Sequence, residues 1–168
     1  GFGSWRRDTA HIALRAGNLI DPDVARASLL YVVSGGFDNG TDGDALPAVA
    51  VWDHYLATGD ASLAEATWPA LADLASALDE RFDTRRGLVA APQSTSNDLF
   101  DEPEAGGFAL GTEVYAMASY DALARMAALP KVADDRAAAW AERAAVMRAA
   151  ILASYWNPEL GYFTSGPA

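Results

Sequence analysis

The sequence contains no cysteine and only two histidines, and these shortages exclude several kinds of catalytic site. Without cysteine the chain cannot form disulfides, bind zinc through thiolates or use a cysteine nucleophile. His11 and His54 are too few for a histidine-based metal centre, so we interpret both as structural residues of helices. We therefore expect no metal site and no cofactor.

Basic residues are also scarce, and no long apolar run is present. Only 12 lysines and arginines stand against 23 aspartates and glutamates, which gives a net charge of −11. Nucleic acid binding draws on clusters of basic residues, and a membrane helix needs about 18 apolar residues, so we expect neither partner. The chain begins with glycine and shows no signal peptide, so we interpret it as processed or excised, with its localisation open.

Helical periodicity dominates the 168 residues, whose length and composition fit one globular domain. The predicted fold is all-α, and the short connection Thr58-Gly59-Asp60 predicts antiparallel neighbouring helices. In the first helix Ile12, Leu14 and Leu19 are the expected apolar anchors, whereas residues 34–43 are predicted to form a long loop. The expected helices cover about 8–18, 22–33, 44–57, 60–81, 108–129 and 133–154.

A repeat accompanies this pattern. Residues 82–89 resemble residues 155–163, since each segment follows a long helix, turns on a glycine (Gly87 or Gly161) and returns through a short apolar stretch. The spacing of the two glycines fits two helices and their loops. The repeating unit is therefore predicted to be an αα-hairpin, and stacked hairpins form solenoids or closed α/α toroids.

The connection between residues 90 and 107 is long and acidic, which favours a functional role over a merely solvated loop. Cleavage of a glycosidic bond needs one carboxylic acid and a second carboxylate, and apolar or acidic neighbours keep the acid protonated. Asp98, Asp101 and Glu102 lie close together with Phe100 among them, so their carboxyl groups have both acidic and apolar neighbours.

A second candidate site lies near the start of the chain. The adjacent Arg7 and Asp8 can bind neighbouring sugar hydroxyls, because a hydroxyl both donates and accepts hydrogen bonds. Trp5 offers an apolar platform for a pyranose ring. The alternative is that Asp8 caps the first helix while Arg6 and Arg7 form surface ion pairs.

Four segments follow one another along the chain: Trp5-Arg6-Arg7-Asp8-Thr9-Ala10, Gly43-Asp44-Ala45-Leu46-Pro47-Ala48, Trp68-Pro69-Ala70-Leu71 and Asp98-Leu99-Phe100-Asp101-Glu102. In order and approximate spacing they resemble segments of glucoamylases and related six-hairpin glycosidases. The resemblance implies that Arg7 and Asp8 hold the terminal sugar, that Asp101 matches the general acid, and that Glu102 matches a substrate-binding glutamate. Phe100 replaces the usual tryptophan, and related trehalases and α-glucosidases point to Asp98 as the acid instead.

The family fold that this resemblance implies is an (α/α)6 barrel of twelve helices, of which residues 1–168 would form about half. The expected activity is hydrolysis of α-linked glucosides or related glycans, with inversion if the glucoamylase pattern holds. The second catalytic carboxylate would then lie outside these residues, so the rest of the barrel is needed and the chain alone is expected to be inactive.

Three alternatives stay open at this point. A sugar epimerase or polysaccharide lyase could have the same toroidal fold, although such enzymes usually use His or Tyr as the acid or base. A helical-repeat binding protein would not bring the acidic connection close to Arg7 and Asp8. Residues 38–44 are similar to a calcium loop, but Val49 stands where an EF-hand needs glutamate, so a glycine-rich turn is preferred.

Overall fold

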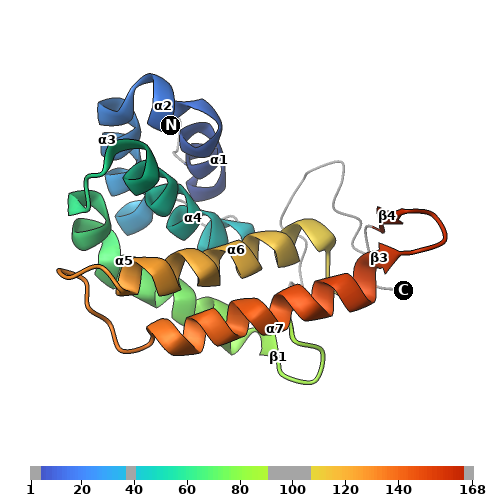
Figure 1. Ribbon diagram of the computed structural model, residues 1–168. Coiled ribbons are helices and arrows are strands. Elements are labelled where there is room, and N and C mark those ends of the chain that lie inside the picture. Colours follow the sequence, from blue (N-terminus) through green and yellow to red (C-terminus); the bar gives the residue numbers. More distant parts are fainter. Residues whose placement is uncertain (1–4, 37–40, 91–106, 165–168) are drawn as a thin grey trace.

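A computed structural model describes residues 5–36, 41–90 and 107–164, which are mostly helical (Figure 1). This confirms the all-α prediction. A continuous helical segment comes first, followed by five long helices and two short β-hairpins. The elements are α1 (Arg6–Ile12), the π-helical turn η1 (Ala13–Gly17), α2 (Asn18–Ile20), α3 (Pro22–Gly35), α4 (Thr41–Thr58), α5 (Ser62–Glu80), β1 (Phe82–Asp83), β2 (Leu88–Val89), α6 (Leu110–Ala127), α7 (Ala137–Tyr155), β3 (Trp156–Asn157) and β4 (Tyr162–Phe163).

The helices stack as antiparallel hairpins, as the short connections predict. α4 packs between α1 and α6, and these three helices begin at the same end of the molecule. α3 and α5 run in the opposite direction, and α7 returns along α6 (Figure 1). The core is centred on α4, where Leu46 and Val51 are fully buried. Among the described residues, no helix has both the length and the hydropathy to cross a membrane.

Several predicted boundaries are wrong, and α7 begins at Ala137 rather than near residue 133. α4 begins at Thr41, so the predicted loop 34–43 is too long at its C-terminal end. Asp42 and Asp44 lie in the first turn of α4, where the helix dipole favours negative charge. The first helix begins at Arg6 rather than near residue 8, and Asp8 lies in its first turn instead of capping it.

The predicted anchors of the first helix are also wrong in part. Ile12 is 68% exposed and Leu19 is 79% exposed, whereas Leu14 packs against the core. The π-helical turn at Ala13–Gly17 inserts an extra residue, which rotates the following face of the helix. As a result the polar Asn18 points inward, where its amide contacts Asp53 at 2.8 Å and His54 at 3.2 Å.

The repeat predicted from the sequence is confirmed as two hairpins of the same design. β1 pairs with β2 and β3 pairs with β4, both antiparallel. In the first turn Asp83 Oδ1 accepts hydrogen bonds from the backbone N–H groups of residues 85 and 86. In the second turn Asn157 Oδ1 accepts from residues 159 and 160. Such Asx turns are local structures that a short sequence can specify.

Candidate functional site

A polar cluster lies where α1, α4 and α6 begin. Thr112 Oγ1 of α6 donates a hydrogen bond to Asp42 Oδ1 of α4 over 2.9 Å. Arg6 Nη1 of α1 lies 3.5 Å from Asp44 Oδ1 of α4. Three helices that are distant in the sequence are therefore joined by side chains at one end of the molecule. We call this set the N-terminal cluster; it consists of Arg6, Thr41, Asp42, Asp44, Arg81 and Thr112.

Asp44 is the centre of the charge pairing in this cluster. Its carboxylate is 8% exposed and contacts two guanidinium groups, those of Arg6 and Arg81. Arg81 directly follows α5, and its Nη1 also donates to Thr41 Oγ1 at 3.3 Å. A buried carboxylate is costly unless it is paired, so removal of one partner from such a group is strongly destabilising. The pairing thus fixes the end of α5 against the start of α4.

The path of the Arg6 side chain depends on a glycine after α3. A Cβ at Gly36 would lie 2.9 Å from Arg6 Cγ and 2.7 Å from the carbonyl oxygen of Val32. Both distances are shorter than real Cβ contacts allow, so a side chain at this position would displace the arginine. The buried Nε of Arg6 has no hydrogen-bond partner among the described residues.

The accessible residues at this end come from α1 and its N-cap. Trp5 is 45% exposed and the Asp8 carboxylate 54%, whereas the Arg7 side chain is only 14% exposed. Arg7 Nε donates to Asp8 Oδ1 over 3.3 Å, so the two groups form the pair that the sequence suggests. The arginine that reaches the α4 carboxylate is Arg6 rather than Arg7. The expectation that Arg6 and Arg7 form surface ion pairs is therefore only partly correct, because Arg7 pairs with the exposed Asp8 whereas Arg6 pairs with the buried Asp44.

His11 and Tyr115 lie beside these residues. Their rings pack edge to face, with centroids 5.4 Å apart, and join α1 to α6. Burial lowers the pKa of His11, and the positive charges of Arg15 and Arg7 lower it further. The imidazole is thus neutral near pH 7 and can donate and accept a hydrogen bond. A sugar hydroxyl also donates and accepts hydrogen bonds, so it can pair with this imidazole in either direction.

Glu113, one residue after Thr112, has a different environment. Its side chain is fully buried, and Oε2 accepts a hydrogen bond from the Val89 backbone N–H over 2.9 Å. Burial raises the pKa of this carboxyl to about 8, although the bond from Val89 lowers it. A protonated carboxylic acid at neutral pH follows from these surroundings.

The second predicted group, Asp98, Phe100, Asp101 and Glu102, lies outside the described residues. The structure places the residues that flank this connection. Val89, just before it, is bonded to Glu113, and α6 begins just after it at Leu110. Both flanking segments are therefore adjacent to the N-terminal cluster.

The calcium-loop alternative receives no support from the residues that the structure describes. Asp42 and Asp44 lie in helix α4 and contact Thr112, Arg6 and Arg81, whereas Asp38 is outside the described ranges. No group of three or more His, Asp or Glu side chains within the described ranges could hold a metal ion.

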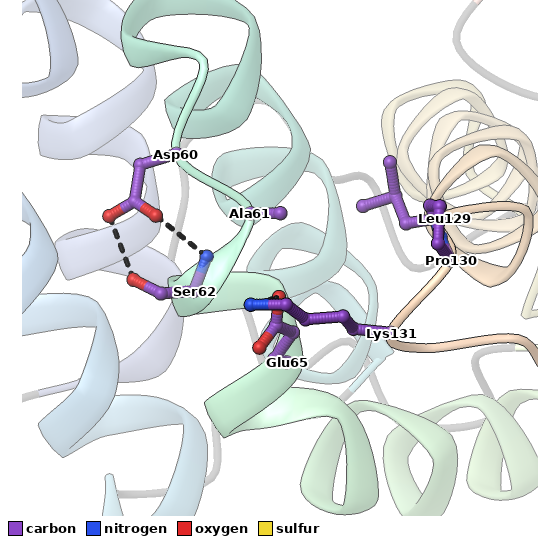
Figure 2. Close-up of a pocket in the computed structure, with 7 residues that line it drawn as sticks. All are labelled: Asp60, Ala61, Ser62, Glu65, Leu129, Pro130 and Lys131. Carbon is purple, nitrogen blue, oxygen red and sulfur yellow. Dashed lines mark hydrogen bonds and ion pairs between the residues drawn. The ribbon is translucent and has the colours of Figure 1, made fainter.

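A small pocket of about 240 Å³ lies at the opposite end of α4 and α6 (Figure 2). Asp60 and Ser62 line it from the start of α5, and Ser62 Oγ donates to Asp60 Oδ2 over 2.7 Å. Lys131, after α6, forms an exposed ion pair of 3.3 Å with Glu65. These contacts join two helix connections, and the pocket is far along both helices from the N-terminal cluster.

The sequence marks only part of this site. The segment around Asp44 resembles a family motif, but nothing in the sequence points to Arg81, Thr112 or Glu113. Their partners lie 24 to 70 positions away in the sequence. No local pattern marks them, because the packing of α4, α5 and α6 creates the contacts.

The chain is similar to known proteins over nearly its whole length. Residues 9–166 match the model of the bacterial alpha-L-rhamnosidase 6 hairpin glycosidase domain. Among solved structures, a rhamnosidase from Klebsiella oxytoca with rhamnose bound is similar, with a TM-score of 0.72 and 16% identity. The match covers 98% of this chain and 35% of that chain, so the present chain spans about a third of its length. At this identity the likeness shows the fold, and it confirms the predicted half of an (α/α)6 toroid. None of the curated proteins is a significant match.

Proposed function

Because this chain belongs to the bacterial α-L-rhamnosidase six-hairpin glycosidase family, we propose that the complete protein hydrolyses α-L-rhamnosides. The match over residues 9–166 is the observation that carries this proposal. It supports a glycoside hydrolase, as the sequence predicts. The finer prediction of a glucoamylase-like enzyme acting on α-glucosides is not confirmed, since the family points to rhamnosides instead.

The sugar would bind at the end of the molecule where α1, α4 and α6 begin. Trp5 offers an exposed ring for the apolar face of a sugar, and the Arg7–Asp8 pair offers a donor and an acceptor. The N-terminal cluster holds these residues in place, because Arg6 joins the start of α1 to Asp44. In this proposal the cluster positions the binding residues and does not itself react.

The connection between α5 and α6 would supply the general acid, from Asp98 or Asp101. Glu102 would support the substrate, and Phe100 would contact the sugar. If the mechanism inverts, the two catalytic carboxyl groups stand roughly 6.5–9.5 Å apart, with water between them and the sugar. We propose that residues outside these 168, in the same chain or in a partner, complete the ring and supply the second carboxylate.

The test uses the complete protein with two aryl glycosides, a p-nitrophenyl α-L-rhamnoside and the corresponding α-D-glucoside. We expect hydrolysis of the rhamnoside and loss of more than about 100-fold in kcat for Asp98→Asn or Asp101→Asn, whichever residue is the acid. Asp73→Asn, on the exposed side of α5, is the matched control and should leave kcat unchanged.

Three outcomes would contradict parts of the proposal. Normal turnover in both the Asp98 and the Asp101 variants would remove the assignment of the acid. Faster cleavage of the glucoside would restore the glucoamylase interpretation. Binding of rhamnose without any cleavage would favour the helical-repeat binding protein.

A further inference from the structure

Glu113 joins the two segments that flank residues 91–106. It lies in the first turn of α6, and its Oε2 accepts the hydrogen bond from the N–H of Val89, the last residue of β2. The neighbouring Thr112 is bonded to Asp42 of α4. A single turn of α6 therefore contacts both the β1–β2 hairpin and the N-terminal cluster.

The surroundings of this carboxyl are apolar. A small core formed by Leu88, Phe108, Ile151 and Tyr155 packs beneath the hairpin. Glu113 Oε1 and the Tyr155 hydroxyl are both buried, and neither has a hydrogen-bond partner among the described residues. An ionised carboxylate with a single N–H partner would be costly in this environment, so the neutral form is favoured. Burial raises the pKa of both groups, and the nearby Glu113 carboxyl contributes to that of Tyr155.

Glu113 cannot be a catalytic residue in this arrangement. Its side chain is fully buried, so it does not reach the surface where a sugar would bind. Its hydrogen bond instead holds Val89, two residues before residues 91–106, against α6. A displacement of about 1 Å in a catalytic group can cost roughly 100-fold in rate, so a contact of this kind can control turnover without touching the substrate.

We propose that Glu113 is a positioning residue, a neutral carboxylic acid that fixes the segments on both sides of residues 91–106 against the start of α6. The inference rests on the proposed function, since it assumes that this connection carries the general acid. The titratable groups near Glu113 are Tyr155 from α7, Arg86 from the β1–β2 turn, which interacts with Tyr155 and stacks on Phe108, and Asp42 of α4 through Thr112.

The first experiment compares Glu113→Gln with Glu113→Leu in the complete protein. Glutamine is neutral and retains an acceptor for the Val89 N–H, so we expect kcat within about twofold of the wild type. Leucine removes the acceptor, and we expect kcat to fall about 10- to 100-fold with little change in KM. The control is Leu63→Ala at the start of α5, beside the pocket at the other end of the molecule from Glu113, which destabilises the domain and should keep kcat.

The second experiment measures the Tm of wild type and Glu113→Gln against pH, and it needs no substrate. The pKa of Glu113 is raised in the folded state, so its contribution to stability is complete below the unfolded pKa near 4.5 and is lost as pH rises towards 8. The Tm of the wild type should therefore fall relative to that of Glu113→Gln between pH 5 and 8.

The outcomes separate this inference from the proposed function. A wild type that cleaves no glycoside would refute the proposed function and with it the positioning role, whatever the Tm profiles show. In an active enzyme, a Glu113→Leu variant with normal kcat, or with a loss no larger than that of Leu63→Ala, would overturn the positioning role. Parallel Tm profiles for wild type and Glu113→Gln would show that the carboxyl is not held neutral, and would overturn the inference as well.

Discussion

The two β-hairpins share the same local structure but differ in what covers them. In both, an Asx residue accepts two backbone hydrogen bonds and the glycine has a positive φ, +68° at Gly87 and +71° at Gly161. The base of each hairpin is closed by an equivalent backbone bond of 2.8 Å, from Ala90 to the carbonyl oxygen of Arg81 and from Thr164 to that of Tyr155.

Their surroundings differ completely. In the first hairpin Leu88 and Val89 are buried, and Gly87 packs against Val146 and Ala150 of α7. In the second hairpin the equivalent residues Tyr162 and Phe163 are 54% and 41% exposed, and nothing among the described residues lies within 4 Å of a Cβ at Gly161. Turn formation is therefore local, whereas burial depends on the helix that packs over the turn.

The largest expected difference concerns the apolar residue after each turn. Leu88→Ala should reduce the free energy of unfolding by about 2–5 kcal/mol, because the leucine is fully buried and its loss leaves a cavity. The equivalent change Tyr162→Ala should cost within about 0.5–1 kcal/mol in the 168-residue chain, because the ring is half exposed. Urea unfolding followed by tryptophan fluorescence measures both. Equal losses would show that the second hairpin is covered in solution.

The two glycines should differ by a smaller amount. Alanine at either position would have to adopt the left-handed backbone conformation, which costs about 1–2 kcal/mol for a residue with a Cβ. At Gly87 the new Cβ would also lie 3.0 Å from Val146 Cγ1 and 3.3 Å from Ala150 Cβ, which adds crowding of about 1–3 kcal/mol. Gly87→Ala should therefore have the lower urea midpoint. A Gly161→Ala variant that is equally destabilised would mean that strain alone decides both positions.

The smallest expected difference concerns the Asx residues themselves. Asp83→Ala and Asn157→Ala each remove an acceptor of two exposed backbone hydrogen bonds, which is worth about 1 kcal/mol. Because the turns are local and exposed, thermal unfolding should show that the two variants lose the same free energy of unfolding to within about 0.5 kcal/mol. A clearly larger loss at Asp83 would show that α7 depends on the shape of the first turn.

The same distinction explains which sequence predictions are confirmed. The helices, the short Thr58-Gly59-Asp60 connection and the repeated turns depend on neighbouring residues, and the structure contains them. The anchor Leu19 is wrong because a π-helical turn at Ala13–Gly17 changes the face of the helix that follows, whereas Ile12 precedes this turn and is exposed at the end of α1. A single inserted residue of this kind has no clear signature in apolar spacing.

The residues of the candidate site also fall into two groups, those that the sequence marks and those that only the packing distinguishes. Trp5, Arg7 and Asp8 are predicted as sugar-binding residues because they lie close together in the sequence and their residue types suit a sugar, and this role stays a prediction. Glu113 looks like an ordinary helical glutamate in the sequence, and only its contact with Val89 and its burial distinguish it. The roles of Asp98 and Asp101 stay predictions, because these residues lie outside the described ranges.

Composition, periodicity and glycine placement alone determined that this protein is a set of antiparallel helices with repeated turns on a glycine, since those features act over a few neighbouring residues. Only the tertiary structure decided that Arg6, Asp44 and Arg81 meet, and that Glu113 is buried beside a hairpin. The reason is that charge pairing and desolvation depend on distances between helices, and packing sets those distances rather than any local spacing of residues.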